Sequence, residues 1–347
     1  MKRTLTQLYQ FVFLPVLLVG AVYVWWQSGG QLDRDAMAET TRRLSLPTVL
    51  VLCGLHLGQQ LVRAFRLSVL LNQRVAWRRL ISAVMLHEFF TTMLPLKAGA
   101  VSLPEVLKRE GVPRSQTLAV MVAIMGLDLV AFVLPLILLA VDVRSLPMDV
   151  AALQQPLLVV CLVLVMAAAG GLFVVRRFDD WMAGKSVSDS AGPRFWVVSQ
   201  LRLFLRSMAG LTRRQLAYGM LLGVLNLTIA ICFSFVFVRE LAPQLGWQPI
   251  LVVILIMRVV GKFALQGFAG LGTNEPILVF LLCAIGLGTS ESLTITVLGR
   301  AFHLGLITAG AAVGGLLLCW PSRRTLDDGQ TGQSIATPIP PDCPARF

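Results

Sequence analysis

The sequence predicts an all-α fold, a polytopic helical bundle of the inner membrane, on the strength of three observations. Of the 347 residues, 56% are hydrophobic and only 14% are charged, and the mean hydropathy is +0.77. Soluble domains are far less apolar. The apolar residues gather in segments of about 20, the length that a helix needs to cross the hydrocarbon core. The basic residues lie mostly between these segments.

The formal net charge of +12 raises the question of a nucleic-acid partner. The basic residues have no interleaved aromatic residues, and their place between apolar segments is typical of the inner face of a bilayer. The charge therefore indicates contact with anionic membrane lipids, and no nucleic acid is expected as a partner.

Six segments are long and apolar enough to be full spans. The first follows Lys2 and Arg3 without a small-residue cleavage pattern after it, so a retained span is expected in place of a cleaved signal peptide. The six predicted spans are residues 8–26, 46–71, 116–140, 156–175, 217–238 and 291–319.

Two further apolar segments are interrupted, and we predict that they form re-entrant helical hairpins. Residues 80–110 break at MLPLKAG, and residues 249–288 break at GFAGLGTNE. Each half is too short to cross a bilayer, and irregular backbone at membrane depth is tolerated only where protein or a water-filled cavity covers it. The residues expected at the breaks are Pro95, Gly99, Gly267, Gly270 and Gly272.

The distribution of Lys and Arg predicts the orientation of the chain. With the N-terminus inside, the cytoplasmic pieces hold 20 of the 30 basic residues and the external loops hold five. Because Lys and Arg collect on the cytoplasmic side, both termini are expected in the cytoplasm.

The same order of elements occurs twice and predicts an inverted repeat. Residues 1–140 and 156–320 each contain three spans and one hairpin, and three crossings invert the second unit. The first hairpin would then enter from the cytoplasm and the second from outside. GVPRSQTLAVMV (111–122) and GLGTSESLTITV (286–297) share Gly, Ser, Leu and Val in one register. A basic cytoplasmic linker at 176–216 would join the repeats, and the tail 321–347 is expected to be disordered.

Ionisable side chains inside apolar segments cost about 2.5 to 3.5 kcal/mol each on insertion scales, so each one needs a reason. Arg258 and Lys262 lie four residues apart on one helix face, just before the second break. They either bind an anionic ligand or pair with Glu275 or Glu291 and hold the hairpin together.

Arg300 and His303 share a face of the last span. One interpretation has them face a phosphate or a carboxylate, and the other has Arg300 extend to the outer interface. In the first hairpin, Lys97 either adds charge to an anion site at a helix N-terminus or belongs to the positive-inside residues.

The span 46–71 carries a polar stripe, which predicts that this face lies toward the bundle interior or a cavity. Arg66 is expected to reach the cytoplasmic headgroups. Asp128, in the middle of its span, is expected either to balance an arginine or to take up a proton. The stripe consists of His56, Gln59, Gln60 and Arg63. The substrate-binding candidates are Arg258, Lys262, Arg300, His303, Glu275, Lys97, Arg63 and Asp128.

The sequence contains no motif for catalysis, a metal or a cofactor. His87-Glu88 is not HExxH, and the three histidines lie in separate segments. Gly270 and Gly272 lack the strand and the third glycine of a nucleotide loop. No catalytic residue, metal ligand or cofactor is therefore expected.

Together LPLKAG at 94–99, GFAGLGTNE at 267–275 and Arg300 resemble the flippase-like family defined by the transmembrane region of lysylphosphatidylglycerol synthases. The likeness covers most of residues 10–320. Lys97 stands where the family pattern has arginine, Ala100 where it has an acid, and Ala269 where it has a glycine. The resemblance implies lipid translocation, with two hairpins meeting between the leaflets.

The leading hypothesis is a lipid translocase that moves an anionic or glycosylated headgroup between leaflets, and no enzymatic activity is expected. One alternative is an integral membrane enzyme on polyprenyl phosphates with Glu275 or Asp128 as base. The other is a non-transporting partner that positions a membrane synthase or glycosyltransferase through residues 176–216.

Overall fold

The computed structural model describes residues 42–71, 75–94, 99–141, 206–208, 210–263 and 274–319, together with a few single positions. All regular structure in these ranges is helical, which confirms the all-α prediction for them. The helices are α4 (Leu46–Leu71), α5 (Trp77–Met93), α6 (Ser102–Lys108), α7 (Arg114–Val141), α10 (Arg213–Leu241), α11 (Trp247–Phe263), α12 (Asn274–Ala284) and α13 (Thr289–Cys319).

Four of the described helices are long and apolar enough to cross a membrane: α4, α7 up to Phe132, α10 and α13. They overlap four of the predicted spans, 46–71, 116–140, 217–238 and 291–319. The other two predicted spans, 8–26 and 156–175, lie outside the described residues, apart from single helical positions in the second. The same holds for the tail 321–347 and for most of the linker 176–216.

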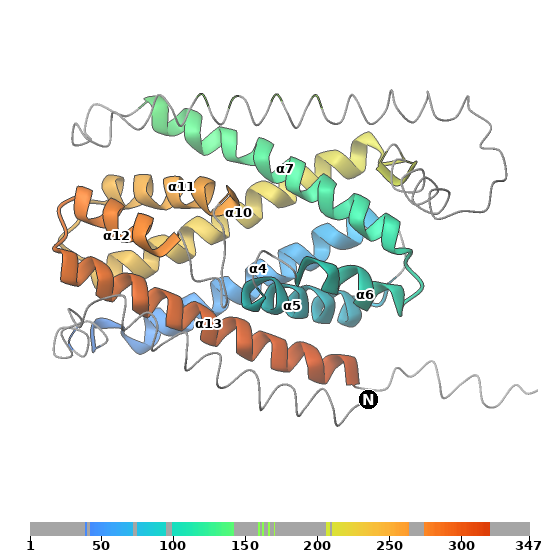
Figure 1. The fold of residues 1–347 in the computed structure, drawn as a ribbon, viewed down its shortest axis with the longest axis horizontal. Helices are drawn as coiled ribbons and strands as arrows, with labels where there is room; N and C mark the ends of the chain where they lie inside the picture. Colours follow the sequence, from blue (N-terminus) through green and yellow to red (C-terminus); the bar gives the residue numbers. More distant parts are fainter. Residues whose placement is uncertain are drawn as a thin grey trace, which may run out of the picture.

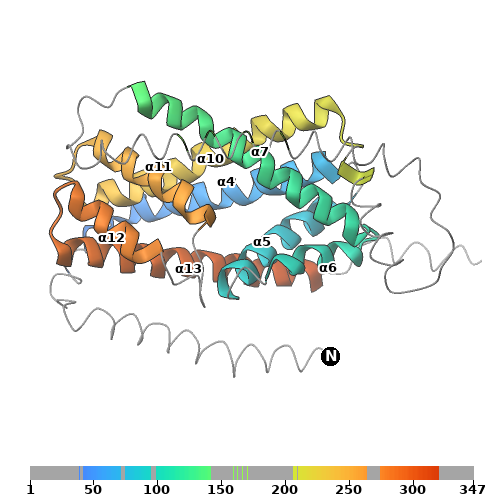
Figure 2. The same cartoon turned by 45° about the horizontal axis from the view of Figure 1, so that its top comes forward.

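The long helices extend along the long dimension of the molecule, and the short helices lie beside them in two pairs (Figure 1). One pair is α5 and α6, and the other is α11 and α12. The two pairs lie toward opposite ends of the long dimension in both views (Figure 2). Each half of the described chain therefore repeats one order: a long helix, two short helices and a second long helix.

Two large apolar clusters form the core, one near each end of α4. The first consists of residues from the beginning of α4 and from α10, α11, α12 and α13. It includes Leu52, Leu241, Ile250, Leu282 and Ile295. The second joins the end of α4 to α5, α6 and α7, and includes Leu67, Leu71, Leu80, Leu107 and Ala119. The stretch of α4 between Leu52 and Ala64 belongs to neither cluster, and its inward face is polar.

A glycine with positive φ ends the second short helix of each pair. Gly111 follows α6 with φ 87°, and Gly286 follows α12 with φ 101°. The next residue closes the helix end in both cases, because Val112 N donates to Leu107 O at 3.2 Å and Leu287 N to Leu282 O at 3.1 Å. Both ends are Schellman motifs, in which glycine avoids the steric cost of the left-handed conformation.

The carboxyl end of α4 is held by side chains from the beginnings of two other long helices. Gln116 of α7 donates to Leu71 O at 2.9 Å, and Gln215 of α10 donates to Val69 O at 3.1 Å. Gln215 also forms a capping box with Thr212, which fixes the start of α10. These bonds fix the position of α4 and of its polar face.

Candidate functional site

The polar stripe of α4 faces the interior of the bundle, as the sequence predicts. His56, Gln59 and Gln60 are buried, whereas Leu57 and Leu61 on the opposite face are exposed. Gln60 Nε2 lies 3.3 Å from His56 Nε2. An inward polar stripe between two apolar clusters makes the middle of the bundle a site for polar ligands or for polar contacts between helices.

Glu88 of α5 is the carboxylate that faces this stripe. Its Oε1 accepts a hydrogen bond from Arg63 Nη1 at 2.6 Å, and its Oε2 accepts one from Gln60 Nε2. Both oxygens of the carboxylate thus contact α4. Charge-assisted hydrogen bonds of this kind compensate the desolvation of a buried charge.

His303 of α13 and Arg258 of α11 approach the same group from two further helices. The rings of His303 and His56 lie 6.1 Å apart and nearly perpendicular. Glu88 interacts electrostatically with His303 and with Arg258. Side chains from four helices therefore meet here, and we name the group of His56, Gln60, Arg63, Glu88, Arg258 and His303 the central polar cluster.

Arg258 is held by neutral groups. Its Nη2 donates to Ala230 O at 2.6 Å and to Ser234 Oγ at 2.7 Å, both on α10. No carboxylate in the described part of the chain lies within ion-pair distance of it. A buried cation without a paired carboxylate is a candidate to bind an anion.

Arg300 pairs with Glu275 and links α13 to α12. The distance from Arg300 Nε to Glu275 Oε1 is 3.8 Å. Of the two acids that the sequence offers as partners of Arg258, Glu275 lies beside Arg300, and Glu291 lies at one end of the bundle. Arg258 therefore pairs with neither acid, whereas the same alternative for Lys262 concerns a side chain outside the described residues.

The expectation that Arg66 reaches the headgroups is also wrong. Its side chain is only 3% exposed, and its Nη1 donates to Asp128 Oδ1 of α7 at 2.5 Å. The guanidinium also lies against Gly223 of α10, where a Cβ atom would come within 2.8 Å of Nη2. The acid of α7, which the chain order alone does not assign to Arg66, draws this side chain inward. Asp128 thus balances an arginine, one of its two predicted roles.

Gly99, one of the residues expected at the first break, lies against the backbone of α5. A Cβ atom at this position would be 2.1 Å from the carbonyl carbon of Phe90, so only glycine fits. Nearby, His87 Nδ1 lies 3.3 Å from Ser102 Oγ and links α5 to α6. These contacts hold the two short helices of the first pair together.

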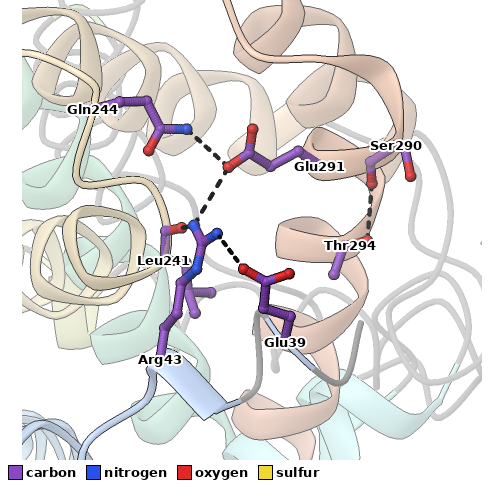
Figure 3. Close-up of polar contacts among 7 residues, drawn as sticks. All are labelled: Glu39, Arg43, Leu241, Gln244, Ser290, Glu291 and Thr294. Carbon is purple, nitrogen blue, oxygen red and sulfur yellow. Dashed lines mark hydrogen bonds and ion pairs between the residues drawn. The ribbon is translucent and has the colours of Figure 1, made fainter. Parts of the chain in front are cut away.

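A second polar network lies at one end of the bundle (Figure 3). Arg43 Nη1 donates to Leu241 O at 3.2 Å and lies 3.8 Å from Glu291 Oε1, which also accepts from Gln244 Nε2 at 2.8 Å. The network joins the segment before α4, the end of α10 and the beginning of α13. Its side chains are partly exposed, so its contribution to stability is small.

Comparison with known families decides the class of the protein. The model of the lysylphosphatidylglycerol synthase TM region matches residues 12–311. The chain belongs to this family. No curated protein matches it significantly. Membership confirms the resemblance seen in the sequence and, with four helices long enough to span a bilayer, makes the chain a multi-pass membrane protein related to lipid synthesis and flipping.

Several predicted site residues of this family member fall outside the described part of the chain. They are Lys97, Pro95, Gly267, Gly270, Gly272 and the side chain of Lys262. Among the remaining candidates, Arg63, Arg258 and His303 belong to the central polar cluster, whereas Arg300 with Glu275 and Asp128 with Arg66 form separate ion pairs. Within the described ranges, no three His, Cys, Asp or Glu side chains are placed to hold a metal ion.

Glu88 is the residue of the cluster that belongs neither to the predicted polar stripe nor to the substrate-binding candidates. It is the only acid in α5, whose sequence is WRRLISAVMLHEFFTTM. A search for an acid to balance the cations of span 46–71 would have found it. Helix periodicity cannot identify Glu88, because its partners Gln60 and Arg63 lie on another helix.

Proposed function

We propose that this chain is a lipid translocase, which moves an anionic or glycosylated lipid headgroup between leaflets through the central polar cluster. The observation that carries the proposal is the meeting of buried or partly buried arginine, histidine and glutamate side chains from four helices between two apolar clusters. Ionisable groups at this depth are expensive, and in membrane proteins they mark substrate pathways.

The donors of the cluster suit a phosphate-containing headgroup. Arginine presents planar donors that match phosphate oxygens, and Arg258 is bound only to neutral acceptors among the described residues. Gln60 Oε1 is buried without a hydrogen-bond donor in the described part of the chain. A glycerol or sugar hydroxyl would supply that donor. The acyl chains would remain in the lipid.

The proposed architecture is an inverted repeat with two re-entrant hairpins, built on α5 with α6 and on α11 with α12. The repeated order of long and short helices supports it, and so do the matching Schellman ends at Gly111 and Gly286. In transporters of this kind, one repeat moves against the other around a fixed central site. Both termini would face the cytoplasm of the inner membrane.

A leaflet-access assay on the reconstituted protein tests the function. Vesicles contain headgroup-labelled anionic lipid, and a membrane-impermeant quencher reports which leaflet holds it. We expect the double variant Arg258→Ala, Arg300→Ala to lose at least about tenfold in translocation rate, because it removes two partly buried cations from the interior of the bundle.

The matched control is the double variant Arg213→Ala, Arg214→Ala, which removes two exposed arginines at the start of α10. It should translocate lipid like the wild type. Equal rates for the wild type and the Arg258, Arg300 variant, with both proteins folded, would contradict the proposal.

A further inference from the structure

Glu88 occupies donors that an anionic ligand would use. Arg63 Nη1 and Gln60 Nε2 both donate to this carboxylate, one to each oxygen. A lipid phosphate that approached Arg63 would meet an arginine already bound to an internal anion. The carboxylate therefore limits what the site can accept.

Among the described residues, and with the histidines neutral, the charges around Glu88 sum to one positive charge. Arg63 and Arg258 interact with each other and share this one carboxylate. The other titratable groups that face it are His56 of α4, the adjacent His87 of α5 and His303 of α13, and α6 presents Ser102 to His87. With the histidines neutral, the described residues leave one positive charge uncompensated.

The neighbouring arginines do not change this sum. Arg66 has Asp128 as its own carboxylate, and Arg300 has Glu275. Among the described residues, each of these contacts joins one cation to one carboxylate. The uncompensated charge thus belongs to Arg258, which is bound to neutral acceptors.

We propose that Glu88 determines how much negative charge the headgroup site accepts. By holding Arg63 and Gln60, it leaves Arg258 to bind a headgroup with one negative charge, a phosphodiester, in preference to a phosphomonoester with two. At low dielectric a mismatch of one charge is costly, so a single carboxylate is enough to discriminate. The inference rests on the proposed function only in taking the ligand to be a lipid headgroup.

The test measures the affinity of the purified chain in detergent for two lipids with the same acyl chains, phosphatidylglycerol and phosphatidic acid. At pH 8 the phosphomonoester carries nearly two charges, because its second pKa is about 6. The wild type should prefer phosphatidylglycerol. Glu88→Gln should raise the affinity for phosphatidic acid relative to phosphatidylglycerol by at least about tenfold, since it frees Arg63.

Two further variants separate charge from structure. Glu88→Asp keeps the charge and should keep the wild-type ratio of affinities. The double variant Arg63→Gln, Glu88→Gln has the same net charge as the wild type and should return the ratio toward the wild-type value. It removes both charges of the pair, so no buried charge is left without a partner. The variant therefore remains informative if Glu88→Gln does not fold.

An unchanged ratio in Glu88→Gln, or a double variant that prefers phosphatidic acid, would overturn the role of Glu88. Binding in detergent needs no translocation, so a shifted ratio in a protein that moves no lipid would contradict the proposed function alone. Inorganic phosphate serves as a third ligand. If it bound as tightly as the lipids, the site would not be a lipid headgroup site.

Discussion

The guanidinium of Arg66 is among the most deeply buried charges of the described chain. Its burial depends on the carboxylate of Asp128. Its side chain is 3% exposed, and that of Asp128 is 16% exposed. Breaking a buried pair costs much more than the pair contributes, because the remaining charge stays desolvated. The pair therefore constrains which substitutions α4 and α7 tolerate.

We expect Asp128→Ala to lower the free energy of unfolding by about 3 to 5 kcal/mol, since it leaves Arg66 buried without a carboxylate. Arg66→Met combined with Asp128→Leu should recover most of this loss, because it removes both charges. Denaturant unfolding in bicelles measures both effects.

The control for this prediction is Glu105→Ala. Glu105 pairs with Arg114 at 2.5 Å, but both side chains are about half exposed. Solvent screens such a pair, so its loss should change stability little. A variant at Asp128 that is no less stable than the variant at Glu105 would contradict the assignment.

At this scale helix periodicity predicts which residues of α4 share a face, but it does not predict a contact with a partner on another helix. The stripe from His56 to Arg63 follows from its spacing. Arg66 lies one turn further on, and position along the span suggested a headgroup contact. The side chain instead turns inward because Asp128 is there, which no pattern within α4 can reveal.

At the scale of elements, the two short pairs end alike. Gly111 and Gly286 both have positive φ, and each is followed by a buried apolar residue, Val112 or Leu287. The two segments that they begin are the ones whose letters align in the sequence. Similar helix ends at matching positions support the proposed repeat and set the direction in which α7 and α13 leave.

We expect Gly286→Ala to destabilise the protein by about 1 to 2 kcal/mol, because an L-residue is strained at φ 101°. Thermal unfolding in detergent, followed by the loss of helical circular dichroism, measures the change. Gly288→Ala is the matched control two residues away, where φ is not positive and a Cβ atom would meet nothing within 4 Å. Equal effects at the two glycines would contradict a Schellman end at Gly286.

The helices were predictable to within a few residues because hydropathy and capping act locally. The predicted span 46–71 coincides with α4, whereas 217–238 falls short of α10, which begins at Arg213. The apolar run excludes Arg213 and Arg214, but the capping box of Thr212 and Gln215 starts the helix before them. Hydropathy thus locates the apolar part of a helix, whereas the capping residues determine where the helix begins.

At the scale of the whole molecule, charge is distributed unequally between the two ends of the bundle. At one end Arg79 of α5 donates to Leu318 O of α13 and pairs with Glu110, and basic residues outnumber acids among the described residues. They are Arg78, Arg79, Lys108, Arg109, Arg114, Arg213 and Arg214, against Glu105 and Glu110. At the other end Arg42, Arg43 and Arg239 are balanced by Glu39, Glu240 and Glu291. From the positive-inside rule we predict that the first end faces the cytoplasm.

This orientation predicts which residues a membrane-impermeant maleimide reaches in intact cells. In a background with the six native cysteines replaced by alanine, a cysteine at Gln244 should be labelled from outside, because it lies exposed in the loop between α10 and α11 at the balanced end. A cysteine at Arg109, exposed at the basic end, should be labelled only after permeabilisation. Labelling of both sites from one side would contradict a bundle that spans the membrane end to end. The reverse pattern would place the basic end outside, against the charge rule, and would invert the direction from which each short pair enters.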